Sequence, residues 1–138
     1  TEIKREILTA KVKNLLPNLK DWAESIWAII RGTVLGFFLG IIPGGGAIVA
    51  SFASYAIEKK VAKHPEEFGK GAIAGVAGPE SANNAAAGSS FIPLLTLGIP
   101  SHAVVAIFLG ALMIHGLQPG PLLMTRAPDL FWGTIASM

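Results

Sequence analysis

The sequence predicts an all-α membrane protein built from discontinuous transmembrane helices and re-entrant hairpins. Composition is the first observation: 51% of the 138 residues are hydrophobic and only 14% are charged, which favours the membrane class over a soluble domain. The second is the clustering of glycine and proline inside apolar runs, above all at Pro43-Gly44-Gly45-Gly46. A helix broken inside a membrane leaves backbone groups that need partners, so such breaks occur where they line a polar site.

The basic residues form two clusters that flank the apolar run 26–57. Five of them lie between residues 4 and 20, and four lie between residues 59 and 70. By the positive-inside rule both clusters face the cytoplasm. As one straight helix the run would span roughly 48 Å, against a hydrocarbon core of about 30 Å. We therefore expect a hairpin over residues 21–57 with its tip at Pro43–Gly46.

Charge, hydropathy and helix breaks divide the chain into six expected segments. In order they are an amphipathic interfacial helix (1–20), a broken-helix membrane hairpin (21–57), a cytoplasmic loop (58–70), broken membrane helices with a polar site (71–116), a loop (117–129) and the start of another span (130–138). Leucines opposite lysines place the first helix on an anionic membrane surface, with packing on a soluble domain as the alternative. Because the sequence starts without Met and ends soon after an apolar run begins, we expect a fragment of a longer protein.

The first arm of the hairpin carries glycine at every fourth position, at Gly32, Gly36 and Gly40. This spacing places small residues along one helix face, which allows another helix to pack closely. Arg31 lies in the same apolar arm, one turn after Trp27. We expect its long side chain to reach the headgroup level, with substrate binding as the alternative.

Packing does not account for the three consecutive glycines that follow Pro43. Glycine adopts left-handed backbone conformations readily, and it leaves its N–H group unshielded. The arm that follows would begin with free N–H groups and the positive end of a helix dipole, which together bind anions without a charged side chain. A phosphate-binding P-loop is excluded, because the Gly-Lys-Ser/Thr sequence it requires is absent.

A second polar cluster, Glu80-Ser81-Ala82-Asn83-Asn84, lies in the stretch 71–116, which contains no Lys or Arg. Hydroxyl and amide oxygens of this kind are ligands for Na⁺ or for a substrate hydroxyl. A carboxylate at membrane depth is a functional candidate, so Glu80 would orient the site or carry a proton. The alternative is that Glu80 and Ser81 cap a helix that begins near Pro79.

Further helix breaks are expected at Gly78-Pro79, at 88–90, at Pro93 and at Gly98-Ile99-Pro100-Ser101. Ser101 would cap a helix over residues 102–115, whose N-terminus would be a second dipole end near the site. His102 could donate to an anion there, although a lone histidine at a helix end is more often structural.

Several classes of function are excluded by what the sequence lacks. It contains no cysteine, which rules out disulfides and thiolate metal sites. No histidine pair has metal-ligand spacing, and no nucleophile–base pair is visible, so we expect neither an enzyme nor a metal site. The net charge of +2 is too small to indicate a nucleic-acid partner.

Six motifs in order carry a resemblance to a known family. They are Arg31-Gly32-Thr33-(x)2-Gly36 with Ile42–Gly46, Ser54-Tyr55-(x)2-Glu58-Lys59, Phe68-Gly69-(x)-Gly71, Gly78–Ala85, Leu97–Pro100, and Gly116-(x)2-Pro119-Gly120-Pro121-Leu122. Over roughly Arg31 to Leu123 the chain closely resembles the large permease subunit of the tripartite tricarboxylate transporters. It differs at Gly78 and Ser81, where the family often carries Ala-Pro-Glu-Ala, and at Ser101-His102, where Gly-Ser is common.

The resemblance implies a fragment of a larger, repeat-built, multi-pass transporter in the bacterial inner membrane. Such a permease imports tri- and dicarboxylates, is driven by a gradient of Na⁺ or H⁺, and needs no other cofactor. Its partners are a periplasmic solute-binding protein and a small membrane subunit. A structural or scaffolding membrane subunit, whose glycines serve only helix packing, is the alternative.

Two sets of residues would form the transport site. The substrate-binding set consists of Pro43, Gly44, Gly45, Gly46, Asn83, Asn84, Gly98, Pro100 and Ser101, and the ion-coupling set consists of Glu80, Ser81 and Asn83.

Overall fold

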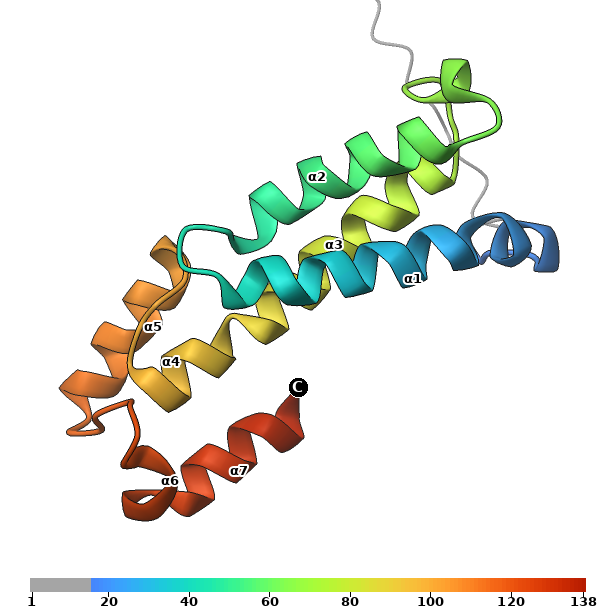
Figure 1. Cartoon of the computed structure of the whole chain (residues 1–138). Coiled ribbons are helices and arrows are strands. Elements are labelled where there is room, and N and C mark those ends of the chain that lie inside the picture. Colours follow the sequence, from blue (N-terminus) through green and yellow to red (C-terminus); the bar gives the residue numbers. More distant parts are fainter. Residues whose placement is uncertain (1–15) are drawn as a thin grey trace, which may run out of the picture.

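The computed structural model describes residues 16–138, which form helices and contain no strand (Figure 1). The elements are α1 (Leu19–Ile41), α2 (Gly46–Val61), the short 3₁₀ helix η2 (Pro65–Glu67), α3 (Ala74–Ser89), α4 (Phe91–Leu97), α5 (Ala103–Ile114), α6 (Leu123–Arg126) and α7 (Pro128–Ser137). The predicted all-helical fold class is confirmed. The amphipathic helix expected over residues 1–20 falls almost wholly outside the described residues.

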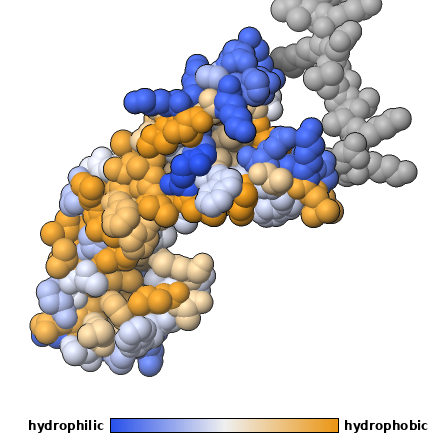
Figure 2. All heavy atoms as spheres, turned by 45° about the vertical axis from the view of Figure 1, so that its right-hand side comes forward, coloured by the Kyte–Doolittle hydropathy of each residue, from blue (hydrophilic) through white to orange (hydrophobic). Residues whose placement is uncertain are grey.

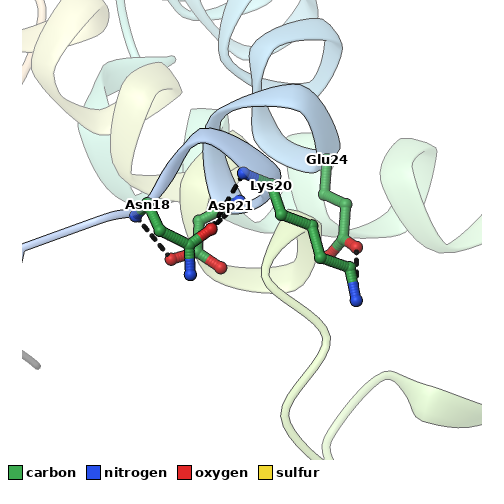
Figure 3. A network of polar contacts seen from close by, with 4 residues as sticks. All are labelled: Asn18, Lys20, Asp21 and Glu24. Carbon is green, nitrogen blue, oxygen red and sulfur yellow. Dashed lines mark hydrogen bonds and ion pairs between the residues drawn. The ribbon is translucent and has the colours of Figure 1, made fainter.

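A capping box starts α1 (Figure 3). The Asn18 side chain accepts hydrogen bonds from the backbone N–H groups of Lys20 and Asp21, and the Asp21 carboxylate accepts one from the Asn18 N–H. Lys20 and Glu24 form an exposed ion pair one turn further on, at 3.7 Å. The first N–H groups of a helix have no acceptor within it, so this box fixes where the long helix begins.

Helices α1, α2 and α3 pack side by side through small residues (Figure 1). A Cβ atom added to Gly32, Gly36 or Gly40 would overlap the backbone of α3, so only glycine permits this approach. The predicted packing role of this stripe is therefore confirmed, and its partner is α3. The buried stripe of α2 has the same four-residue spacing: Gly46, Ala50, Ser54 and Glu58.

The predicted helix break at Gly78-Pro79 is wrong, because Pro79 lies inside α3. Backbone bonds from Gly75 to Ala72 and from Val76 to Ile73 form a first turn ahead of the proline. Only the bond that the proline nitrogen would have donated to the preceding turn is lost. The proposed role of Glu80 and Ser81 as caps is wrong for the same reason. The break expected at 88–90 is present, since α3 ends at Ser89 and α4 begins at Phe91. The break expected at Pro93 is wrong, because Pro93 lies in the first turn of α4, where the missing N–H costs no helical hydrogen bond.

The C-terminal helices are tied to the end of α4. Gly98 ends α4 in a left-handed conformation with φ of 71°. Its Cα hydrogen faces the Pro119 carbonyl, which a Cβ would approach to 2.7 Å. Gly120 donates its N–H to the Leu95 carbonyl at 3.2 Å. These contacts hold the loop before α6 against α4, above a small core of Leu95, Leu123 and Phe131.

The outer surface is strongly apolar. Among residues 16–138, α1 is the one helix whose length and composition suit a membrane span, and α5 is a shorter apolar helix. Figure 2 shows hydrophobic residues over most of the visible face, with hydrophilic residues gathered where α1 starts and α2 ends. In the loop at that end, the backbone and the His64 side chain donate hydrogen bonds that lower the pKa of Glu66.

Candidate functional site

Two loops that are far apart in sequence meet where α1 ends (Figure 1). The Gly44 N–H donates a hydrogen bond of 2.8 Å to the Ser101 carbonyl, and the Gly45 N–H donates one of 2.9 Å to Ile42. The added Cβ of Gly46 would lie 3.2–3.4 Å from three carbon atoms of His102. We call this contact of Gly44–Gly46 with Ser101–His102 the turn junction.

The glycines of the turn are required by backbone conformation. Gly44 and Gly46 have φ values of 84° and 68°, in the left-handed region that side chains disfavour. A Cβ on Gly45 would overlap the Leu39 carbonyl, whereas a Cβ on Gly44 would meet nothing within 4 Å. The turn glycines thus serve a sharp reversal of the chain, and the glycines of α1 serve packing.

Two helix N-termini converge on the turn junction. Helix α2 begins at Gly46 and α5 begins at Ala103, and neither has a side-chain cap. The expectation that Ser101 caps this helix is wrong, because His102 is the N-cap residue. Ser101 is instead buried beneath the turn at 2% exposure. Its Oγ and the His102 Nε2 are buried atoms for which the described residues provide no hydrogen-bond partner.

The predicted substrate-binding residues fall into three places. Gly44, Gly46 and Ser101 come together at the turn junction, with Gly45 in the turn itself. Gly98 lies at the other end of its loop, against Pro119. The Glu80–Asn84 cluster lies elsewhere, on α3.

Only part of that cluster lies on the exposed side of α3. Glu80 and Asn84 are exposed, and Asn83 is half-buried. Ser81 donates to the Ala77 carbonyl at 2.7 Å, and the Asn84 amide donates to the Glu80 carbonyl at 2.9 Å. The neighbouring Ala82 packs on Gly36 of α1, about two helical turns from the turn junction. Within residues 16–138, no hydrogen bond joins the cluster to the junction.

The sequence did not predict an ion pair between a half-exposed arginine and a buried carboxylate. Arg31 donates from Nε to Glu58 Oε1 at 2.9 Å and from Nη2 to Oε2 at 2.6 Å. Glu58 is 2% exposed and belongs to α2 rather than to a loop. Arg31 therefore binds a protein carboxylate, while its side chain stays 43% exposed; its expected reach to the headgroup level stays a prediction. Its neutralisation of a desolvated acid explains why a charge is tolerated in an apolar helix.

The geometry of this pair links it to the helix packing. Glu58 and Ser54 both contact the position where Gly78 of α3 would carry a side chain. A cavity of about 500 Å³ opens beside the pair, and Lys63 and Glu67 are among its lining residues. The four-residue spacing of Gly46, Ala50, Ser54 and Glu58 is the sequence signal that could have found the buried acid.

Comparison with known proteins gives two relatives from Agrobacterium vitis. The chain is 58% identical over 137 residues to the "Uncharacterized 52.8 kDa protein in TAR-I ttuC' 3'region", covering 99% of the chain and 27% of that protein. It is 64% identical over 103 residues to the "Uncharacterized protein in TAR-II ttuC' 3'region", covering 75% of the chain and 43% of that protein. The chain thus spans less than half the length of either relative. No solved structure matches it.

The family comparison agrees with the motifs. The match to the family described as "Tripartite tricarboxylate transporter TctA family" extends over residues 1–138. It covers all of the glycine- and proline-rich motifs, including both loops of the turn junction. The chain therefore belongs to the tripartite tricarboxylate transporter TctA family.

Proposed function

We propose that this chain is part of the membrane permease of a binding-protein-dependent secondary carrier. The carrier imports tri- and dicarboxylates across the bacterial inner membrane and is coupled to a gradient of Na⁺ or H⁺. Membership of a tricarboxylate transporter family supports the class of substrate. The periplasmic solute-binding protein and the small membrane subunit are the partners that a tripartite carrier requires.

The turn junction is the observation that carries this proposal. It brings the uncapped N-termini of α2 and α5 to one place. Helix N-termini attract anions through free N–H groups and the helix dipole, and transporters use the ends of broken helices in this way. Because the Gly44 and Gly45 N–H groups already have acceptors, the donors offered to a carboxylate are the first-turn N–H groups and the Ser101 hydroxyl.

The coupling ion is assigned to the open side of α3. Glu80, Ser81 and Asn83 supply carboxylate, hydroxyl and amide oxygens, which suit Na⁺, and Glu80 could carry a proton instead. Asn84 completes the polar surface and contributes to substrate binding. Ala87 lies on the same face and also lines a groove that reaches His102, so the ion and substrate sites would lie along one surface.

The structural alternative explains the glycines themselves. Packing against α3 accounts for Gly32, Gly36 and Gly40, and the left-handed backbone of the turn accounts for Gly44, with φ of 84°. What favours a site over a scaffold is the meeting of two uncapped helix N-termini at the turn junction.

The test uses the complete permease with its partner subunits, given a panel of carboxylates at varied Na⁺ and pH. Gly44→Ala places a side chain on a left-handed residue at the junction. Gly110→Ala makes the same change in α5, where nothing lies within 4 Å, and serves as the matched control. We expect uptake to fall in the first variant and to persist in the second. Equal uptake by both, at equal membrane abundance, would favour the scaffold.

A further inference from the structure

We propose that His102 and Ser101 are the side chains that bind a substrate carboxylate at the turn junction, with the His102 imidazole as the principal donor. The assignment rests on the proposed function and deepens it. Its basis is the position of the imidazole together with Ser101 Oγ and His102 Nε2, two of the three buried side-chain polar atoms, with Ser54 Oγ, that have no hydrogen-bond partner among the described residues.

The imidazole lies against the start of α2. His102 has an extended backbone, with φ of −157° and ψ of 173°. The atoms nearest to the missing Cβ of Gly46 are its Cβ, Cδ2 and Cγ, at 3.2, 3.3 and 3.4 Å. The Cγ–Cδ2 edge of the ring therefore lies against the start of α2, and Nε2 is the atom bonded next to Cδ2. A side chain at Gly46 would push the ring away.

The junction has donors but lacks an acceptor. Buried polar atoms in folded proteins nearly always have a hydrogen-bond partner, yet Ser101 Oγ and His102 Nε2 have none among the described residues. Both can donate, and they adjoin two helix N-termini, which also present donors. The arrangement lacks a group that accepts several hydrogen bonds and carries negative charge. A carboxylate meets both requirements.

No described residue near the imidazole supplies that charge. Gly46 packs against one side of the ring. The other surroundings come from a groove of about 330 Å³ lined by Ser90, Phe91, Phe108 and apolar residues, with His102 as its one ionisable member. An acceptor for these donors would therefore come from outside this part of the chain, and the groove leaves one side of His102 uncovered by the described residues.

The experiment measures uptake of citrate and succinate by the complete permease with its partners, over a range of substrate concentrations. His102→Leu removes the donor, and His102→Gln retains an N–H group near the position of Nε2. We expect the leucine variant to raise KM by about tenfold or more, since a hydrogen bond to a charged group is lost. The glutamine variant should raise KM less, and the maximal rate should change little in either. His115→Gln, at the exposed far end of α5, should match the parent.

Each outcome separates the two proposals. If the parent transports carboxylate and His102→Leu has the parent's KM, the assignment of His102 is overturned and the proposed function stands. If the parent, present in the membrane with its partners, transports none of the panel, the proposed function fails and the assignment fails with it. Should the leucine variant be absent from the membrane, His102→Gln is compared with the shorter His102→Asn. A lower KM for glutamine supports the assignment, and equal values overturn it.

Discussion

Glu58 is a charged side chain buried among the small residues of three helices, and Arg31 holds both of its oxygens. Taking away the guanidinium leaves a desolvated carboxylate without a counter-charge. Because Arg31 is itself 43% exposed, the cost is lower than that of a fully buried pair, which is about 3–5 kcal/mol. We therefore expect Arg31→Leu to lower the thermal unfolding midpoint of the purified complete permease. The double variant Arg31→Leu with Glu58→Leu should recover part of that loss, because it removes the buried charge as well. A single variant as stable as the parent would contradict this account.

The same pair shows where sequence reasoning failed at the scale of residues. Glu58 precedes Lys59 and Lys60, so a count of charges assigned it to the basic loop. The spacing of Glu58 indicates its burial better than its neighbours do, because Glu58 continues the four-residue stripe of buried residues in α2. Arg31 was recognised as unusual, but a single sequence does not say which acid lies opposite it in space. That knowledge required the helices to be placed side by side.

At the scale of elements, the approach of α1 to α3 depends on residues without side chains. A Cβ on Gly36 would overlap the Ala82 backbone, which cannot move aside as a flexible side chain can. We expect Gly36→Ala to destabilise the complete permease by about 1–3 kcal/mol, although alanine has the higher helix propensity by about 1 kcal/mol. Gly88→Ala in α3 meets nothing within 4 Å and is the matched control. Thermal unfolding of both variants, monitored by tryptophan fluorescence, checks this, and equal midpoints would refute it.

The predicted elements were correct where glycine sets the backbone. The turn between α1 and α2 and the end of α4 at Gly98 both use left-handed glycines, and local sequence is enough to locate such residues. The predicted helix break at Pro79 is wrong, although proline disfavours a helix interior. In the structure a full turn precedes it, and Ser51 of α2 donates to its carbonyl at 3.3 Å. Neighbouring helices thus stabilise a proline that its own sequence would place at a helix end.

At the scale of the whole molecule, the sequence did not predict which residue the turn between α1 and α2 would contact. A broken helix predicts free N–H groups, but it does not identify the carbonyl that one of them meets. The structure supplies Ser101 as that partner, while the Glu80–Asn84 cluster lies on another surface. The contact joins residues from separate parts of the chain, so only a folded arrangement identifies it. Re-entry of the hairpin into a membrane stays a prediction.

The exposed side of α3 leads to the last prediction. Glu80, Asn84 and Ala87 share this face, spaced as one side of a helix. A carboxylate facing lipid would be costly, and the chain covers only 27% of one relative's length. We therefore expect the rest of the permease to enclose this face around a water-filled path. Ala87 also lines the groove beside His102, so this path would reach the turn junction.

Cysteine labelling of the complete permease, freed of any native cysteines, tests that path. Ala87→Cys should react with a membrane-impermeant maleimide, and bound carboxylate should slow the reaction, because the substrate occupies the same water-filled space. Ile48→Cys lies on the apolar outer surface of α2, where the native side chain is 74% exposed. It should resist the reagent, since a thiol facing lipid stays protonated and out of reach of a water-soluble probe. Labelling of position 48 but not of position 87 would mean that α3 turns its polar face to packed protein, and the path would then have to lie elsewhere.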